Sequence, residues 1–168
     1  MPLALLALTI SAFAIGTTEF VIVGLIPTIA EQIGVTVPSA GLLVTIYALG
    51  VALGAPVLTA LTSRIPRKLL LVGLMVLFTL GNLLAWQSPS YESLVIARLL
   101  TGLAHGVFFS IGSTIATSLV AKEKAASAIA IMFGGLTVAL VTGVPLGTFI
   151  GQQFGWRETF LAVSLLGA

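Results

Sequence analysis

The sequence contains no cysteine and no aspartate, one histidine, and few charged residues of any kind. Without cysteine the chain has no disulfide and no thiolate metal ligand, and a single histidine without aspartate argues against a protein-built metal site. Charged residues make up 7% of the chain, whereas a soluble domain carries about 25%. So few charges cannot cover a water-facing surface, and the net charge of +2 is too small to indicate a nucleic-acid partner.

What the chain has in abundance is apolar side chains, with 58% hydrophobic residues and a mean hydropathy of +1.21. Such a composition indicates residues that face lipid. The first apolar run, from Leu3 to about Ala30, follows no basic segment and is far longer than the apolar core of a signal peptide. We therefore interpret it as a retained membrane helix.

Five apolar stretches are long enough to cross a bilayer, for which a helix needs about 20 residues. They are Leu3–Ala30, Ala40–Leu61, Leu69–Trp86, Ser93–Val120 and Ala126–Ile150. A sixth stretch, Thr159–Ala168, is only half a span at about 1.5 Å per residue. The sequence thus predicts an all-α membrane protein with one transmembrane bundle over residues 1–168, whose sixth helix is incomplete, and we expect the chain to be a fragment, a truncated gene product or half of a split protein.

The charges between the stretches predict an orientation. Two alternate loops hold five basic residues, namely Arg64, Arg67, Lys68, Lys122 and Lys124. Lysine and arginine favour the cytoplasmic side, so we expect the N-terminus to be cytoplasmic. The aromatic residues expected at the outer ends of the helices are Trp86, Tyr91 and Trp156, which agrees with an interfacial aromatic belt.

Glu19 lies near the middle of the first stretch, where a charged carboxylate costs several kcal/mol. It can avoid that cost by binding a proton. A group that gains and loses a proton as its exposure changes is what a proton-coupled transporter requires. The alternative is a structural carboxyl group bonded to a neighbouring helix.

Arg98 and His105 lie seven residues apart in the fourth stretch and project from nearly the same face, with Gly102 between them. Arg98 retains its charge and must face protein or water. It could hold an anionic or polar substrate, pair with Glu19, or bond to backbone carbonyls at a helix bend. Histidine can titrate near neutral pH, and His105 is either a proton carrier or a polar residue bonded between helices.

Small residues and prolines recur in the second, fourth and fifth stretches. Spacings of four residues between small residues allow close helix packing, and proline can kink a helix. The packing or kink candidates are Gly102, Gly106, Gly143, Pro145 and Gly147, and the further cavity candidates are Thr17, Tyr47, Thr137 and Thr142. A short internal repeat relates residues 54–57, Gly-Ala-Pro-Val, to residues 143–146, Gly-Val-Pro-Leu.

Several of these segments resemble the major facilitator superfamily, and within it the bacterial drug-proton antiporters. Residues 18–27, Thr-Glu-Phe-Val-Ile-Val-Gly-Leu-Ile-Pro, look like the first helix of arabinose-efflux-like permeases. Residues 143–148 followed by Gly155-Trp156-Arg157 are similar to the same group, and Arg98 with Gly102 matches the fourth-helix motif of the superfamily. The resemblance covers essentially the whole chain.

Two motifs depart from the superfamily pattern. In the cytoplasmic motif Gly-x-Leu-x-Asp-Arg-x-Gly-Arg-Lys, the residues that fit are Leu61, Arg64, Arg67 and Lys68, and those that differ are Thr59, Ser63 and Pro66. Ser63 replaces an aspartate that works in a charge-dependent gating network. In the antiporter motif of the fifth helix, Val144 and Thr148 replace glycines, so that motif alone does not establish export.

The resemblance implies the N-terminal six-helix bundle of a twelve-helix transporter, with a cavity between two bundles. Glu19, Arg98 and His105 would line that cavity. The implied activity is proton-driven efflux of a small organic solute (a drug, a sugar or a nucleoside-like compound), with the proton gradient as energy source, no cofactor, and a C-terminal six-helix half as partner in a bacterial inner membrane. The alternatives are a non-transporting fragment or assembly module and an uptake permease of the same fold. A membrane enzyme is disfavoured because a second acid, a nucleophile and a metal-ligand set are missing.

Overall fold

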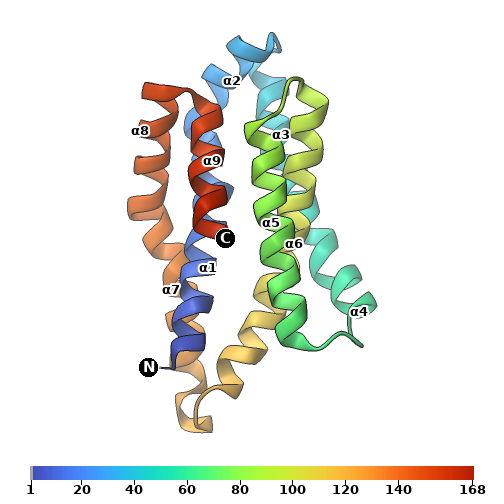
Figure 1. Ribbon diagram of the computed structural model, residues 1–168, viewed down its shortest axis with the longest axis vertical. Coiled ribbons are helices and arrows are strands. Elements are labelled where there is room, and N and C mark those ends of the chain that lie inside the picture. The colour runs from blue at the N-terminus through green and yellow to red at the C-terminus, as the bar shows by residue number, and fades with distance from the viewer. Residues whose placement is uncertain (1) are drawn as a thin grey trace.

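The computed structural model describes residues 2–168, and within that range every regular element is a helix (Figure 1). The longer helices run side by side along the long axis of the molecule. In chain order the elements are α1 (Leu3–Val21), η1 (Ile22–Leu25), α2 (Ile26–Ile33), α3 (Val37–Leu53), η2 (Gly54–Leu58), α4 (Thr59–Leu61), α5 (Arg67–Trp86), α6 (Tyr91–Ser118), η3 (Lys122–Lys124), α7 (Ala125–Val138), η4 (Ala139–Gly143), α8 (Val144–Phe154) and α9 (Trp156–Gly167).

These elements combine into five continuous segments that are long and apolar enough to cross a membrane. They are Leu3–Ile33, Val37–Leu61, Arg67–Trp86, Tyr91–Ser118 and Lys122–Phe154. The molecule is therefore an all-α membrane protein. The helix α9 has 12 residues, which at about 1.5 Å per residue is shorter than the hydrocarbon core.

The helices α3 and α6 begin two or three residues before their apolar stretches, and a polar capping residue starts each of them. Thr36 accepts a hydrogen bond from the Ser39 backbone N–H at the start of α3. At the start of α6, Ser90 and Ser93 form a reciprocal capping box. Such hydroxyl caps satisfy the first free N–H groups of a helix, but they carry no hydropathy signal.

Proline positions explain the irregular turns. The first span, which the apolar pattern predicts as one helix, contains the 3-10 turn η1 just before Pro27. Proline offers no N–H to the carbonyl four residues back, and its ring crowds that carbonyl. Pro56 lies inside the π-helical turn η2, and Pro145 lies two residues after the π-helical turn η4. The first part of the short internal repeat therefore lies within a local widening of its helix, and the second part begins at the last residue of another.

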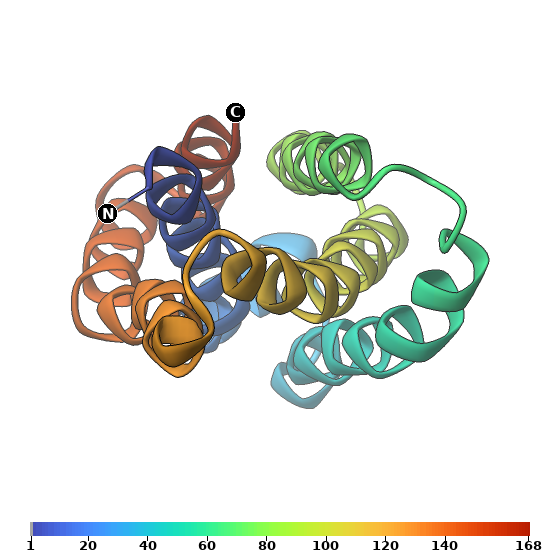
Figure 2. The ribbon, with the colours of Figure 1, turned by 90° about the horizontal axis from the view of Figure 1, so that it is seen from below.

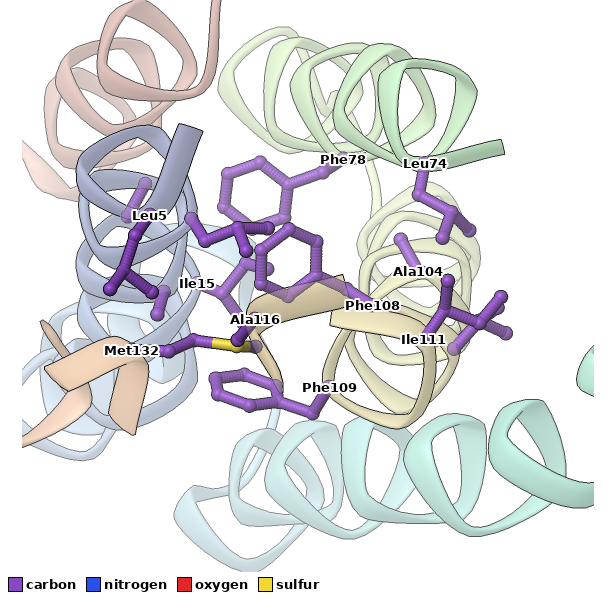
Figure 3. Close-up of a cluster of buried hydrophobic side chains, with 14 of the residues drawn as sticks. Leu5, Ile15, Leu74, Phe78, Ala104, Phe108, Phe109, Ile111, Ala116 and Met132 are labelled. Atoms are coloured by element: carbon purple, nitrogen blue, oxygen red, sulfur yellow. The ribbon is translucent and has the colours of Figure 1, made fainter. Parts of the chain in front are cut away.

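Seen along its length, the molecule consists of two groups of helices (Figure 2). One group contains α1, α7 with α8, and α9, and the other contains α3, α5 and α6. The groups meet where α5 packs against α9 and α6 packs against α7. Large apolar side chains fill the space between them (Figure 3), including Leu5, Ile15, Phe78, Phe108 and Met132.

The outer surface of the bundle is apolar, as a lipid-facing surface requires. On α5, exposed side chains follow one another at helical spacing, namely Leu69, Val72, Val76 and Leu80. Because nothing in the described chain covers this stripe, it is suited to contact lipid acyl chains.

Polar contacts hold the start of α9 to the end of α5. The Arg157 guanidinium lies over the Trp156 ring, 4.3 Å from its centre, and Arg157 Nη2 donates to the Ser88 carbonyl at 2.8 Å. Trp86 Nε1 donates to Glu158 at 3.4 Å. Trp156 itself is fully buried, so its ring belongs to the core and not to the belt of interfacial aromatics predicted for this end of the bundle.

Candidate functional site

Ionisable side chains from three spans meet inside the bundle. Glu19 comes from α1, Tyr47 from α3, and Arg98 and His105 from α6. Arg98 and His105 share a face of α6 because seven residues are close to two helical turns. Glu19 lies three residues before the 3-10 turn η1, where the regular helix of the first span is about to change.

Close packing of α3 on α6 places Tyr47 against this cluster. A Cβ atom added at Gly50 would lie 2.7 Å from the Leu99 carbonyl oxygen, and one at Gly54 would lie 2.6 Å from the Leu103 carbonyl oxygen. Gly102 and Gly106 occupy the same contact from the α6 side. The two backbones thus touch without an intervening layer of side chains, as small residues at a spacing of four allow.

Arg98 is held by the protein and has an exposed fraction of 1%. Its Nη1 donates to the Thr18 carbonyl at 2.9 Å, and its guanidinium lies 4.1 Å from the centre of the Tyr47 ring. No ion pair joins Arg98 to Glu19 in the described part of the chain. Of the roles predicted for Arg98, the one seen here is bonding to a backbone carbonyl near a helix irregularity.

The guanidinium nevertheless keeps unused donors. Its Nε and Nη2 are buried and have no hydrogen-bond partner among the described residues. A buried charged donor without a partner carries a desolvation cost, and this cost falls when an acceptor or a water molecule arrives. Arg98 can therefore take on a further acceptor without giving up Thr18.

His105 connects Tyr47 to Glu19. Tyr47 Oη and His105 Nδ1 are 3.0 Å apart, and His105 Nδ1 lies 3.7 Å from Glu19 Oε2. A neutral His105 can accept the Tyr47 proton at Nδ1, whereas a protonated His105 carries N–H groups on both nitrogens and attracts the carboxylate. Proton binding therefore changes which neighbour Nδ1 favours.

Glu19 and His105 are the members of the cluster that reach the surface. Their side chains are 25% and 13% exposed, respectively, while Tyr47 and Arg98 are almost completely covered. A proton or a solute entering from outside the bundle thus meets the carboxylate and the imidazole first.

An aromatic row extends from His105 to α7. The His105 and Phe109 ring centres are 4.8 Å apart, and those of Phe109 and Phe133 are 4.9 Å apart. Neither phenylalanine is among the residues that the sequence predicts for the site, although Phe109 lies one turn after His105 on the same helix face. The row gives the cluster an apolar wall beside its exposed carboxylate.

Thr18, the residue before Glu19, links α1 to two neighbouring helices. The Thr18 hydroxyl donates to Asn82 Oδ1 at 2.6 Å, and Asn82 Nδ2 donates to the Phe78 carbonyl at 2.9 Å. Thr18 therefore bonds to α5 through its side chain and to α6 through its backbone carbonyl. This arrangement fixes the part of α1 that carries Glu19.

The other predicted cavity hydroxyls lie apart from the cluster. Thr17 is buried, donates to the Phe13 carbonyl at 2.8 Å and packs against Gly143. Thr137 and Thr142 are exposed, and the Thr142 hydroxyl donates to the Val138 carbonyl at 2.8 Å. None of these hydroxyls bonds to the cluster in residues 2–168, and their part in a cavity stays a prediction.

The remaining candidates from the sequence lie outside the cluster, some on α8 and the others near the turn between α4 and α5. Gly147 lies against Val21 and Thr159, so it lets α8 approach α1 and α9. Pro145 is exposed near the start of α8. The loop residues Arg64, Arg67 and Lys68 are exposed at the far end of the molecule from α2.

A bundle of membrane-crossing helices with interrupted spans and a buried charged cluster is the architecture of a secondary transporter. Comparison with known families makes the assignment specific, since the model of the Major Facilitator Superfamily matches residues 8–168. The chain belongs to this superfamily, and its five spans together with the shorter α9 form the N-terminal bundle of that fold.

Curated relatives carry the same assignment. The chain is 58% identical over 164 residues to the uncharacterized MFS-type transporter YtbD of Bacillus subtilis, covering 98% of this chain and 41% of the relative. It is 52% identical to the inner membrane transport protein YdhP of Escherichia coli, covering 97% and 42%. It is 39% identical to a chloramphenicol resistance protein of Streptomyces lividans, covering 98% and 42%. The chain thus spans about two-fifths of the length of the relatives it matches.

Proposed function

We propose that this chain is the half of a transporter that couples proton movement to the efflux of a small organic solute. The observation that carries the proposal is the partly exposed Glu19 carboxylate, 3.7 Å from His105 Nδ1 and inside a membrane bundle. A carboxylate at that depth is costly unless it is paired or protonated. The relative named as a chloramphenicol resistance protein supports export of an organic compound.

In the proposed cycle, proton and solute alternate at Glu19. With Glu19 ionised, the carboxylate and the aromatic row of His105, Phe109 and Phe133 receive the solute. Protonation of Glu19 removes the negative charge and weakens binding of the solute. Arg98 does not titrate in the accessible range, and in this cycle it keeps α1 and α3 in register with α6.

A complete cycle requires a second bundle, because alternating access moves one half of a transporter against the other. The lengths of the curated relatives support a C-terminal half as the partner. We propose a bacterial inner membrane as the location, in keeping with the name of the Escherichia coli relative. The basic loops support an N-terminus on the cytoplasmic side.

Glu19→Gln in a transporter completed by the second half tests the proposal. Glutamine preserves the size and hydrogen-bonding groups of a protonated glutamate but cannot release a proton. We expect transport driven by a pH gradient to fall to background while the amount of folded protein in the membrane stays normal. In a binding assay, wild-type affinity for the solute should weaken as the pH falls, and the variant should lose this dependence.

Glu31→Gln is the matched control, since Glu31 is an exposed carboxylate on α2 outside the cluster. It should transport normally. Near-normal gradient-driven transport by Glu19→Gln would remove Glu19 from the mechanism and make His105 the leading candidate for the proton carrier on this half.

A further inference from the structure

A small pocket lies at the end of the molecule that carries the basic loops, away from Glu19. It has a volume of about 210 Å³, and its lining includes residues from α4 and the following turn, the start of α5 and the second half of α6. A water molecule takes up about 30 Å³ in the liquid, so several waters or one small ion fit. Figures 1 and 2 show the turn that joins α4 to α5, which contributes to this lining.

The lining of this pocket is rich in hydroxyl groups and holds one cation. The hydroxyl-bearing residues are Thr59, Thr62, Ser63, Ser110 and Thr114, and the cation is Arg67. No carboxylate lines the pocket in the described chain, and Arg67 has no ion-pair partner there. Ser63 stands where the superfamily motif has an aspartate, so the carboxylate expected beside these basic residues is missing.

One donor of this lining is buried without a partner. Thr59 Oγ1 is inaccessible to solvent and makes no hydrogen bond in the described residues. Thr62, one turn of the same segment away, already donates its hydroxyl proton to the Leu58 carbonyl at 2.6 Å. This unused hydroxyl and the Arg67 guanidinium belong to one pocket lining, in which the described chain places no carboxylate. Such a lining is suited to an oxygen anion.

The distribution of the donors selects among oxygen anions. Thr59 belongs to α4, Ser63 to the turn after it, Arg67 to α5 and Ser110 to α6. A carboxylate presents two oxygens, whereas a phosphate group presents at least three acceptor oxygens. We propose that this pocket binds a phosphate group, supplied either by the headgroup of an anionic phospholipid or by a soluble phosphate.

Binding is measured on the purified chain with two probes. Native mass spectrometry in detergent compares retention of phosphatidylglycerol with that of phosphatidylcholine. Thermal unfolding in nanodiscs of phosphatidylcholine measures protection by inorganic phosphate, since a ligand that binds only the folded state raises its stability. Selective retention of phosphatidylglycerol identifies a lipid headgroup as the source, whereas protection by inorganic phosphate identifies a soluble anion.

Two pairs of variants separate the pocket from general surface charge. Arg67→Gln should weaken binding of the effective probe about tenfold, as loss of a charge-assisted hydrogen bond does, whereas Arg64→Gln, in the same loop but outside the lining, should change it less than about twofold. Thr59→Val should weaken binding about threefold, as loss of one neutral hydrogen bond does, and Thr62→Val should have less effect because its donor is already used.

Equal losses for Arg67→Gln and Arg64→Gln would overturn the proposal, because nonspecific attraction to the basic loop would then explain the binding. Failure of the wild-type chain to bind either probe would also overturn it. Circular dichroism of each variant confirms that the helices are intact, and the isosteric Thr59→Val change keeps the test informative if an arginine variant folds poorly.

Discussion

Two arginines of this protein are held in the same way at different depths. Arg98 lies over the Tyr47 ring and donates to the Thr18 carbonyl in the interior of the bundle. Arg157 lies over the Trp156 ring and donates to the Ser88 carbonyl at the end of the bundle. Arg98 on α6 thereby contacts both α3 and α1, whereas Arg157 stacks on the neighbouring residue of its own helix α9 and bonds to the turn after α5. The planar guanidinium favours both kinds of contact.

The difference between them is access to water. Arg98 is 1% exposed and has two buried nitrogens without partners, whereas Arg157 is only partly buried. Water can replace lost hydrogen bonds at the end of the bundle but not in its interior. The same arrangement should therefore matter more for Arg98 than for Arg157, and the predictions below test that comparison.

The largest effect is expected for Arg98→Lys. Lysine retains the charge but has neither the planar stacking surface nor the several fixed donors of arginine, and its strongly hydrated ammonium group would have no water here. We expect a loss of about 3 kcal/mol in the free energy of unfolding, measured by denaturant titration in detergent. A loss no larger than that of Arg157→Lys would contradict the comparison.

Gly50→Ala should cause the next largest loss in the free energy of unfolding. It should disturb the surroundings of Arg98 and leave those of Arg157 unchanged. The added Cβ would lie 2.7 Å from the Leu99 carbonyl oxygen, and such overpacking costs about 1–3 kcal/mol. Separation of α3 from α6 should also move Tyr47 away from Arg98. Gly41→Ala is the control, because its Cβ would meet nothing within 4 Å and should leave stability unchanged or slightly higher.

Arg157→Lys should cost less, about 1 kcal/mol, because water can satisfy the Ser88 carbonyl after the change. The variant should also loosen the start of α9, which is detected as faster hydrogen exchange of its amides. Unchanged exchange there would show that the buried Trp156 ring alone anchors α9.

The substitutions expected to change stability least are single cysteines that test which end of the bundle faces the cytoplasm. Single cysteines replace Ser63, in the turn after α4, and Ser90, at the start of α6 near the Arg157 contact. In whole cells, an impermeant thiol reagent should label the cysteine at position 90 and spare the one at position 63. Labelling at 63 alone would reverse the orientation and place Arg157 at the cytoplasmic end.

The sequence was sufficient to predict the membrane spans and to select Glu19, Arg98 and His105 as the residues of interest, because a charged group inside an apolar stretch is unusual. It could not decide the partners of Arg98, since the choice between Glu19 and the Thr18 carbonyl depends on helix rotation and side-chain conformation. The predicted cavity residues include Thr17 and not Thr18, although Thr18 is the one that bonds to Asn82 and Arg98. Adjacent residues point about 100° apart around a helix, so the rotation of α1 decides which of the two meets α5 and α6. Pro27 is by itself a reason to expect an irregular turn at η1.

The contact between α3 and α6 also has a mechanical consequence. Where Gly50 faces Gly102, no flexible side chain separates the two backbones. The contact therefore cannot deform easily, and α3 and α6 are expected to move as one rigid unit. Tyr47 and His105 belong to this stiff pair, whereas Glu19 belongs to α1, whose regular helix is interrupted by η1. During any rearrangement of the bundle, the separation of Tyr47 and His105 is therefore constrained, and the separation of Glu19 and His105 is the one that is free to change.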